Sequence, residues 1–148
     1  MKEKKINSQD YGHHKSLSIY IHIPFCDVIC PYCDFNKFSK VDNLIPEFVS
    51  SLITEIKLRR LKKSNIESLS FGGGTPSILN KKEIESILNS IYKNFRISNN
   101  AEITVEINPN DLTKEKINNY VDLGINRFSI GVQSCLLYTS DAADDGYR

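Results

Sequence analysis

The stretch that decides the fold is YIHIPFCDVICPYCDFNKF, residues 20–38. It begins on a predicted strand, because residues 18–23 alternate isoleucine with polar side chains, and a period of two is typical of a half-buried strand. Directly after that strand come Cys26, Cys30 and Cys33, spaced C-x3-C-x2-C. A structural zinc site takes four ligands and disulfides take cysteines in pairs. Three cysteines in one short loop therefore indicate a different use.

Length and composition indicate one globular domain. The chain has 148 residues, of which 40% are hydrophobic and 25% charged. A formal net charge of +1 predicts no broad attraction to nucleic acid or to an anionic membrane, and no apolar run is long enough to span a bilayer. Residues 1–16 are polar and lack the apolar segment of a secretory signal, so we interpret them as a flexible arm. Clustered, unoxidised cysteines fit a cytoplasmic protein.

The last fourteen residues, 135–148, differ from the rest of the chain. Isoleucine, asparagine and lysine supply 47 of the first 134 residues and none of this tail. The tail carries a charge of −2, against +3 for the body. Its sequence, CLLYTSDAADDGYR, resembles the translation of a common transposon-based sequencing adapter, so we interpret it as non-native. The alternative is an unusual native C-terminus. On the first interpretation Cys135 leaves the cysteine count.

Strands and helices are predicted to alternate through the body. Apolar stripes at helical spacing predict helices over residues 44–63, 81–95 and 113–123, the second capped by Asn80 with Glu83 in capping-box position. Strands are predicted at residues 66–71, 101–107 and 126–134, after the first at 18–23. Repeating strand–helix units favour a parallel sheet, so the predicted fold class is α/β with about four parallel strands and three helices.

Each predicted strand has one apolar and one polar or small face. In residues 101–107, for example, isoleucine and valine alternate with glutamate and threonine. An ordinary buried parallel strand is apolar on both faces. We therefore predict a barrel or half-barrel whose interior holds a polar ligand. A half-exposed antiparallel sheet is the alternative, and the intervening helices count against it.

Four polar loops follow the predicted strands and should meet at one rim, since the carboxyl ends of parallel strands lie at the same edge. They are the cysteine loop, the glycine loop at residues 72–76, residues 106–109, and residues 133–134. Three thiolates can hold three irons of a [4Fe-4S] cluster and leave the fourth iron open to a chelating molecule. The alternative for the cysteines is zinc, with His22 or His13 as a fourth ligand.

The motifs resemble those of the radical S-adenosylmethionine superfamily, and in particular the oxygen-independent coproporphyrinogen III oxidase-like family with its heme-chaperone branch. The matching segments are YIHIPFC…CPYCDFN, FGGGTPS, EITVEINP and INRFSIGVQS, and the resemblance covers residues 17–134 as the N-terminal part of a partial (β/α) barrel. It implies that Cys26, Cys30 and Cys33 ligate a [4Fe-4S] cluster. The contacts that it implies for S-adenosylmethionine are Tyr20, Tyr32, Gly73, Gly74, Thr75, Glu106 and Gln133.

Several of these residues also have a plainer interpretation. The glycines suit a tight strand–helix turn, and Glu106 suits a solvated strand end. Gln133 suits an exposed amide, and Tyr20 a core tyrosine with a satisfied hydroxyl. The resemblance favours the ligand-binding roles.

Phe35 bears on the branch of the family. The resemblance implies that the dehydrogenase proper carries a fourth cysteine two residues after the third cluster ligand, where this chain has Phe35. The CDFN form resembles the heme-chaperone branch, which implies heme as cargo, heme-accepting apoproteins as partners and a low-potential electron donor. The alternative is an oxygen-independent coproporphyrinogen III oxidase acting on coproporphyrinogen III, so whether the protein is an enzyme stays open. None of His13, His14 and His22 is assigned as a heme ligand.

Overall fold

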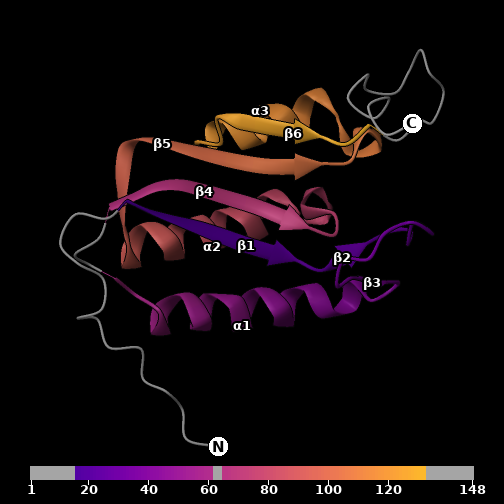
Figure 1. Cartoon of the computed structure of the whole chain (residues 1–148), viewed down its shortest axis with the longest axis horizontal. Coiled ribbons are helices and arrows are strands. Elements are labelled where there is room, and N and C mark those ends of the chain that lie inside the picture. Colours follow the sequence, from indigo (N-terminus) through magenta and orange to yellow (C-terminus); the bar gives the residue numbers. More distant parts are fainter. Residues whose placement is uncertain (1–15, 62–64, 133–148) are drawn as a thin grey trace, which may run out of the picture.

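The computed structural model describes residues 16–61 and 65–132. The predicted arm up to residue 15, Gln133 and the predicted non-native tail lie outside the described residues. Figure 1 shows the elements in chain order. They are β1 (Leu17–Ile23), β2 (Phe25–Cys26), β3 (Phe38–Ser39), the 3-10 helix η1 (Asp42–Leu44), α1 (Ile45–Leu58), β4 (Asn65–Gly73), η2 (Pro76–Ile78), α2 (Lys81–Asn94), β5 (Arg96–Ile107), η3 (Pro109–Asp111), α3 (Lys114–Asp122) and β6 (Arg127–Ile130).

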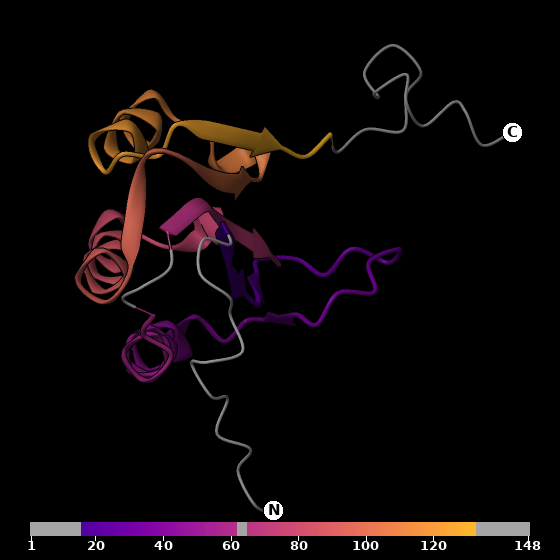
Figure 2. The ribbon, with the colours of Figure 1, turned by 60° about the vertical axis from the view of Figure 1, so that its left-hand side comes forward.

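The main sheet has four strands in the order β1-β4-β5-β6, and every neighbouring pair is parallel. Figure 2 shows α1, α2 and α3 together on one side of this sheet. The predicted α/β class, with four parallel strands and three helices, is confirmed. No helix within the described ranges combines the length and apolar character that crossing a membrane requires.

The hydrophobic core fills the space between the sheet and the helices. Its strand residues come from the predicted apolar faces, and its helix residues come from the predicted stripes. Fully buried members include Ile23, Phe71, Ile87, Ile91 and Val105. Burial of this kind contributes roughly 25 cal/mol for each Å² of apolar surface removed from water, so it fixes which face of each strand meets the helices.

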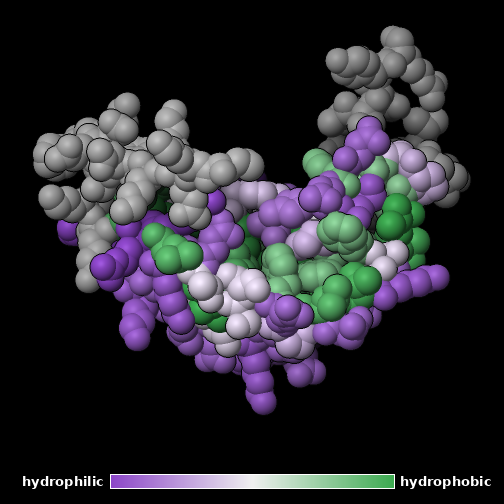
Figure 3. All heavy atoms as spheres, turned by 90° about the horizontal axis from the view of Figure 1, so that it is seen from below, coloured by the Kyte–Doolittle hydropathy of each residue, from purple (hydrophilic) through white to green (hydrophobic). Residues whose placement is uncertain are grey.

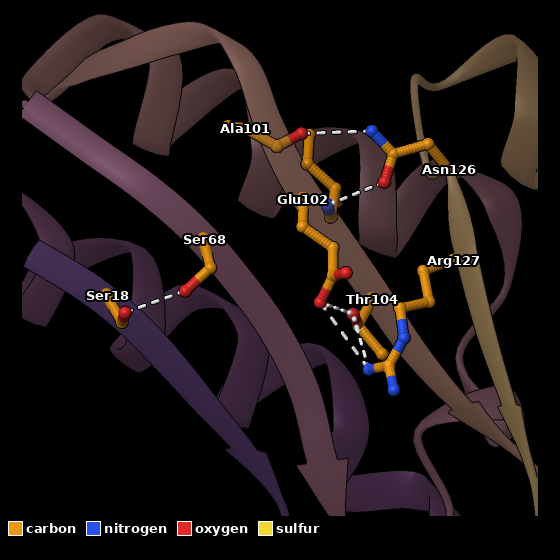
Figure 4. Close-up of polar contacts among 8 residues, drawn as sticks. Ser18, Ser68, Ala101, Glu102, Thr104, Asn126 and Arg127 are labelled. Atoms are coloured by element: carbon orange, nitrogen blue, oxygen red, sulfur yellow. Dashed lines mark hydrogen bonds and ion pairs between the residues drawn. The ribbon is translucent and has the colours of Figure 1, made fainter.

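The other face of the sheet is polar, as the alternation predicts. Figure 4 shows part of it: the Ser68 hydroxyl donates to the Ser18 hydroxyl at 2.7 Å, from neighbouring strands. Nearby, Nη1 of Arg127 lies 3.5 Å from Oε1 of Glu102 and 3.4 Å from the Thr104 hydroxyl. These side chains pair β1 with β4 and β5 with β6, on the face of the sheet opposite α1, α2 and α3.

Local signals placed two helix starts and one helix end correctly. The Asn80 side chain accepts from the Glu83 amide at 3.1 Å while the Glu83 carboxylate accepts from the Asn80 amide at 2.8 Å, so the predicted capping box is confirmed. Thr113 caps α3 through the Lys116 amide at 3.1 Å. After α3 the chain turns at Gly124 with φ +86°, a conformation that favours glycine.

Other boundaries differ from the predictions. Helix α1 ends at Leu58 instead of Lys63, because its buried stripe ends at Ile56 and Leu58 is 81% exposed. Strand β5 begins at Arg96, five residues early, because backbone pairing with the start of β4 extends it despite polar side chains. Strand β6 ends at Ile130, and that side chain is 50% exposed, since no helix of the described residues covers it.

Candidate functional site

The carboxyl ends of the strands meet at one edge of the sheet, as predicted. Ile23 at the end of β1 pairs with Gly73 at the end of β4, and Ile107 at the end of β5 pairs with Ile130 in β6. The cysteine loop, the glycine loop and the turn after Glu106 leave the sheet at this edge. Three of the four predicted loops therefore lie on the same rim, and the fourth, with Gln133, lies outside the described residues.

The glycine loop packs directly against the first cysteine. The Gly74 amide donates to the carbonyl oxygen of Ile23 at 2.8 Å, and the Thr75 amide donates to that of Phe25 at 2.7 Å. A Cβ atom on Gly74 would lie 2.9 Å from the sulfur of Cys26 and 2.7 Å from the Phe25 oxygen. Only a residue without a side chain fits this approach, so the cysteine strand and the glycine loop form one unit.

Glu106 joins this unit from β5. Its Oε2 accepts a hydrogen bond from the Gly73 amide at 3.2 Å, and Gly73 has φ +113°. A Cβ atom on Gly72 would lie 3.0 Å from the Glu106 carboxyl and 2.9 Å from Cε2 of Tyr20. Partial burial and then the negative charge of Glu106 raise the pKa of the Tyr20 hydroxyl. Tyr20, two glycines and Glu106 thus surround one point on the polar face, and the Tyr20 ring is 58% exposed rather than in the core.

The cysteine loop carries three free thiols. Cys26 is buried, while Cys30 and Cys33 are half-buried and share a turn in which the Cys33 amide donates to the Cys30 carbonyl at 3.1 Å. Tyr32 lies against Cys30, and its hydrogen bond with that cysteine raises the Tyr32 pKa. Lys37 donates to the carbonyl oxygen of Cys33 and to that of Phe35, which closes the loop on its C-terminal side.

The donor set consists of three thiols on one loop, which suits a cluster with one iron for each cysteine. Within the described ranges no three histidine, cysteine or acidic side chains converge as a mononuclear metal site would require. His22, one of the two histidines of the zinc alternative, donates from Nε2 to the Asn36 carbonyl at 2.9 Å, and its Nδ1 lies 3.4 Å from the Tyr20 hydroxyl; His13 lies outside the described residues. In an iron–sulfur cluster each cysteine binds a different iron, so the three sulfurs need not meet at one point. Three free thiols on one loop satisfy that requirement.

The outside of the cysteine loop carries several large apolar side chains beside exposed polar ones. Figure 3 shows hydrophobic side chains gathered toward the end of the molecule where β2 and β3 lie. Val28, Tyr32 and Phe35 are 75%, 76% and 67% exposed. Between this loop and α1 lies a groove of about 390 Å³, lined in part by Phe38 and Phe48. The loop thus presents both thiols and apolar side chains outward.

One polar cluster behind the rim was missed from the sequence. Ser77, fully buried after the glycine loop, donates to the Asp111 carboxylate at 2.5 Å. Its carbonyl oxygen accepts from the Lys116 ammonium at 2.6 Å. Both partners come from beyond β5, and nothing in the local pattern around Ser77 indicates them.

Comparison with known proteins defines the class. The family model described as "Radical SAM superfamily" matches residues 20–136. The chain belongs to the radical S-adenosylmethionine superfamily.

Within it, the chain is 43% identical over 122 residues to "Heme chaperone HemW" of Buchnera aphidicola subsp. Schizaphis graminum, covering 80% of this chain and 32% of that protein. It is 35% identical to "Heme chaperone HemW" of Escherichia coli, with 80% and 32% covered. The resemblance to the coproporphyrinogen III oxidase-like family and its heme-chaperone branch is confirmed.

A solved structure gives the same fold. The coproporphyrinogen III oxidase (HemN) of Escherichia coli, described as a radical SAM enzyme, superposes with a TM-score of 0.80 at 30% identity, covering 87% of this chain and 31% of that one. The chain spans about a third of the length of the curated relatives it matches.

Proposed function

We propose that this chain holds a [4Fe-4S] cluster and S-adenosylmethionine, and that the protein is a heme chaperone that passes heme to apoproteins. The contact that carries the first part is the glycine loop. Gly74 packs on the Cys26 sulfur while Gly73 donates to Glu106 at 3.2 Å, so one loop joins the thiols to the carboxylate. The second part is supported by Phe35 and by the similarity to proteins named heme chaperone.

Each group of residues has a distinct role in this proposal. Cys26, Cys30 and Cys33 would hold the cluster and would leave one iron free to bind the amino and carboxylate groups of S-adenosylmethionine. Such a cluster would supply a single electron for radical chemistry on that ligand. Glu106, an acceptor when ionised, receives the ribose hydroxyls. The proposed contacts to S-adenosylmethionine are Tyr20, Tyr32, Gly73, Gly74, Thr75, Glu106 and Gln133.

The open polar face supports a ligand on that side of the sheet. Gly72 leaves the Glu106 carboxylate and the Tyr20 ring accessible, because a side chain at this position would occupy the space beside them. The Glu106 carboxylate, which accepts from the Gly73 amide, keeps further acceptor positions, and the Tyr20 hydroxyl adds hydrogen-bonding capacity there. A polar nucleoside suits these groups better than an apolar molecule does.

A second function is favoured by the HemN structure. That structure is of a coproporphyrinogen III oxidase, and its fold matches this chain at a TM-score of 0.80. On that alternative the protein oxidatively decarboxylates two propionates of coproporphyrinogen III, with a low-potential electron donor reducing the cluster. Phe35 counts against it, since the resemblance implies a cysteine at this position in the dehydrogenase.

The deciding experiment uses full-length protein reconstituted anaerobically with iron and sulfide. Iron content and binding of labelled S-adenosylmethionine test the cofactors. Heme titration and incubation with coproporphyrinogen III, S-adenosylmethionine and a reductant then separate the two functions. We expect heme binding and heme transfer to an apoprotein without turnover of coproporphyrinogen. Formation of protoporphyrinogen would establish the oxidase instead.

A further inference from the structure

The Ser77 hydroxyl lies at a junction between two loops of the rim. Ser77 is 0% exposed, and its hydroxyl donates to Oδ2 of Asp111 at 2.5 Å. The same oxygen accepts from the Asn108 amide at 3.2 Å. Two bonds therefore meet at one buried atom, and both partners come from the turn that follows β5. A third bond, from the Lys116 ammonium to the Ser77 carbonyl at 2.6 Å, adds the first turn of α3.

This junction lies just behind the residues proposed to touch S-adenosylmethionine. Ser77 directly follows the glycine loop, two positions after Thr75, and Asn108 directly follows β5, two positions after Glu106. The two loops also touch at their front, where the Gly73 amide donates to Glu106. The loops are thus joined at the front and at the back. Hydrogen bonds at both ends restrict the movement of the two loops relative to each other more than a bond at one end would.

We propose that Ser77 and Asp111 are positioning residues for S-adenosylmethionine. Neither lies among the ligand contacts; together they hold the glycine loop and Glu106 at the separation that the nucleoside requires. The inference rests on the proposed function, because it concerns the same site. The new claim is that the affinity for S-adenosylmethionine depends on the hydrogen bond between Ser77 and Asp111, two residues that do not contact the ligand.

Loss of the Ser77 hydroxyl alone should weaken the binding of S-adenosylmethionine. A hydrogen bond to a charged group is stronger than a neutral one, and here the serine is fully buried while Asp111 is half-buried. In Ser77→Ala the Asp111 carboxylate loses its donor and the Asn108 amide loses its acceptor. The bonds lost are those to the turn after β5, while the Gly74 and Thr75 amides keep their bonds to Ile23 and Phe25, which hold the glycine loop against the cysteine strand. Cluster content should therefore stay constant while binding of S-adenosylmethionine weakens.

The test compares Ser77→Ala, Asp111→Asn and Asp111→Ala in reconstituted full-length protein. Equilibrium dialysis with labelled S-adenosylmethionine gives the dissociation constant, and iron and sulfide assays give cluster content. We expect Ser77→Ala and Asp111→Ala to raise the dissociation constant about ten-fold, and Asp111→Asn, which keeps an acceptor oxygen, by about two- to three-fold. Iron per chain should match the wild type in all three.

Two matched controls separate positioning from stability. Ser90→Ala removes another buried hydroxyl, one that has no hydrogen-bond partner among the described residues. Ile91→Val removes one methyl group from the core and should lower the melting temperature slightly. Neither change should alter the dissociation constant, because a small loss of stability leaves the protein folded at 25 °C.

Each outcome decides between distinct conclusions. If wild type binds S-adenosylmethionine and the variants at Ser77 and Asp111 bind it equally well, the positioning role is overturned and the proposed function stands. If the wild type with full cluster content does not bind it, the proposed function fails and the positioning role fails with it. If Ile91→Val weakens binding as much as Asp111→Ala does, the effect is one of stability. Should Ser77→Ala not fold, the two Asp111 variants decide.

Discussion

Gly74→Ala would place a methyl group between the glycine loop and the first proposed cluster cysteine. The new Cβ would lie 2.7 Å from the Phe25 carbonyl oxygen and 2.9 Å from the Cys26 sulfur, whereas real Cβ contacts essentially never fall under 3.0 Å. The backbone of one loop must therefore move away. The Phe25 oxygen also accepts from the Thr75 amide at 2.7 Å, so the same movement stretches that bond. Overpacking of this kind costs about 1–3 kcal/mol.

Two measurements follow from this geometry. The melting temperature should fall by roughly 3–10 °C. Iron binding after reconstitution should weaken about ten-fold or more, as happens when the supports of a metal ligand are disturbed. Gly124→Ala is the matched control: its φ of +86° strains alanine by about 1–2 kcal/mol, yet the nearest atom, the Tyr92 hydroxyl oxygen, is 3.6 Å away.

The control loses stability at a site remote from the cysteines, so it should keep its iron. Equal loss of iron in both variants would show that cluster content follows global stability. Wild-type iron content and an unchanged melt in Gly74→Ala would refute the packing of the glycine loop on Cys26.

Three further predictions concern the cysteines, a helix cap and a buried phenol. Cys30→Ser should abolish the cluster absorbance after reconstitution, while Cys135→Ser should leave it unchanged; loss in both would give Cys135 a role. Asn80→Ala removes the capping box and should lower the free energy of unfolding by about 1 kcal/mol without changing iron content. Burial, and then the Asp111 carboxylate, raise the pKa of Tyr120 from 10.0 to about 12. Folding therefore favours the protonated phenol, and its stabilisation is complete below pH 10 and lost between pH 10 and 12. In Tyr120→Phe the free energy of unfolding, measured by denaturant titration at several pH values, should fall less between pH 10 and 12, by up to about 3 kcal/mol. The same fall in wild type and variant would contradict the assignment.

Much of the fold followed from local pattern. The alternation of Ile103, Val105 and Ile107 with polar residues predicted which face of β5 is buried, because side chains alternate across a strand. The Asn80 capping box predicted the start of α2 because its hydrogen bonds join residues three apart. The predicted end of α1 was wrong. The basic residues after Ile56 have high helix propensity, but Ile56 is the last residue of the helix that is buried, so packing does not extend the helix further.

The site was predicted in part for the same reason. The spacing of Cys26, Cys30 and Cys33 is local, so the cysteine loop could be predicted from the sequence, and parallel strand ends must share an edge. The role of Ser77 could not be predicted, because its partner Asp111 is 34 residues away and lies on a different loop. A serine after a glycine loop looks the same whether its hydroxyl meets solvent or a carboxylate.

The sequence by itself determined the alternation of strands and helices along the chain, the polar and apolar face of each main-sheet strand, and the three thiols in one loop. These depend on side-chain period and on caps a few residues long. Only the tertiary structure decided that Gly74 touches the Cys26 sulfur, that Gly73 donates to Glu106, and that Ser77 meets Asp111. Those contacts depend on strand order and register, which arise when a shared core is buried and which no short segment encodes alone.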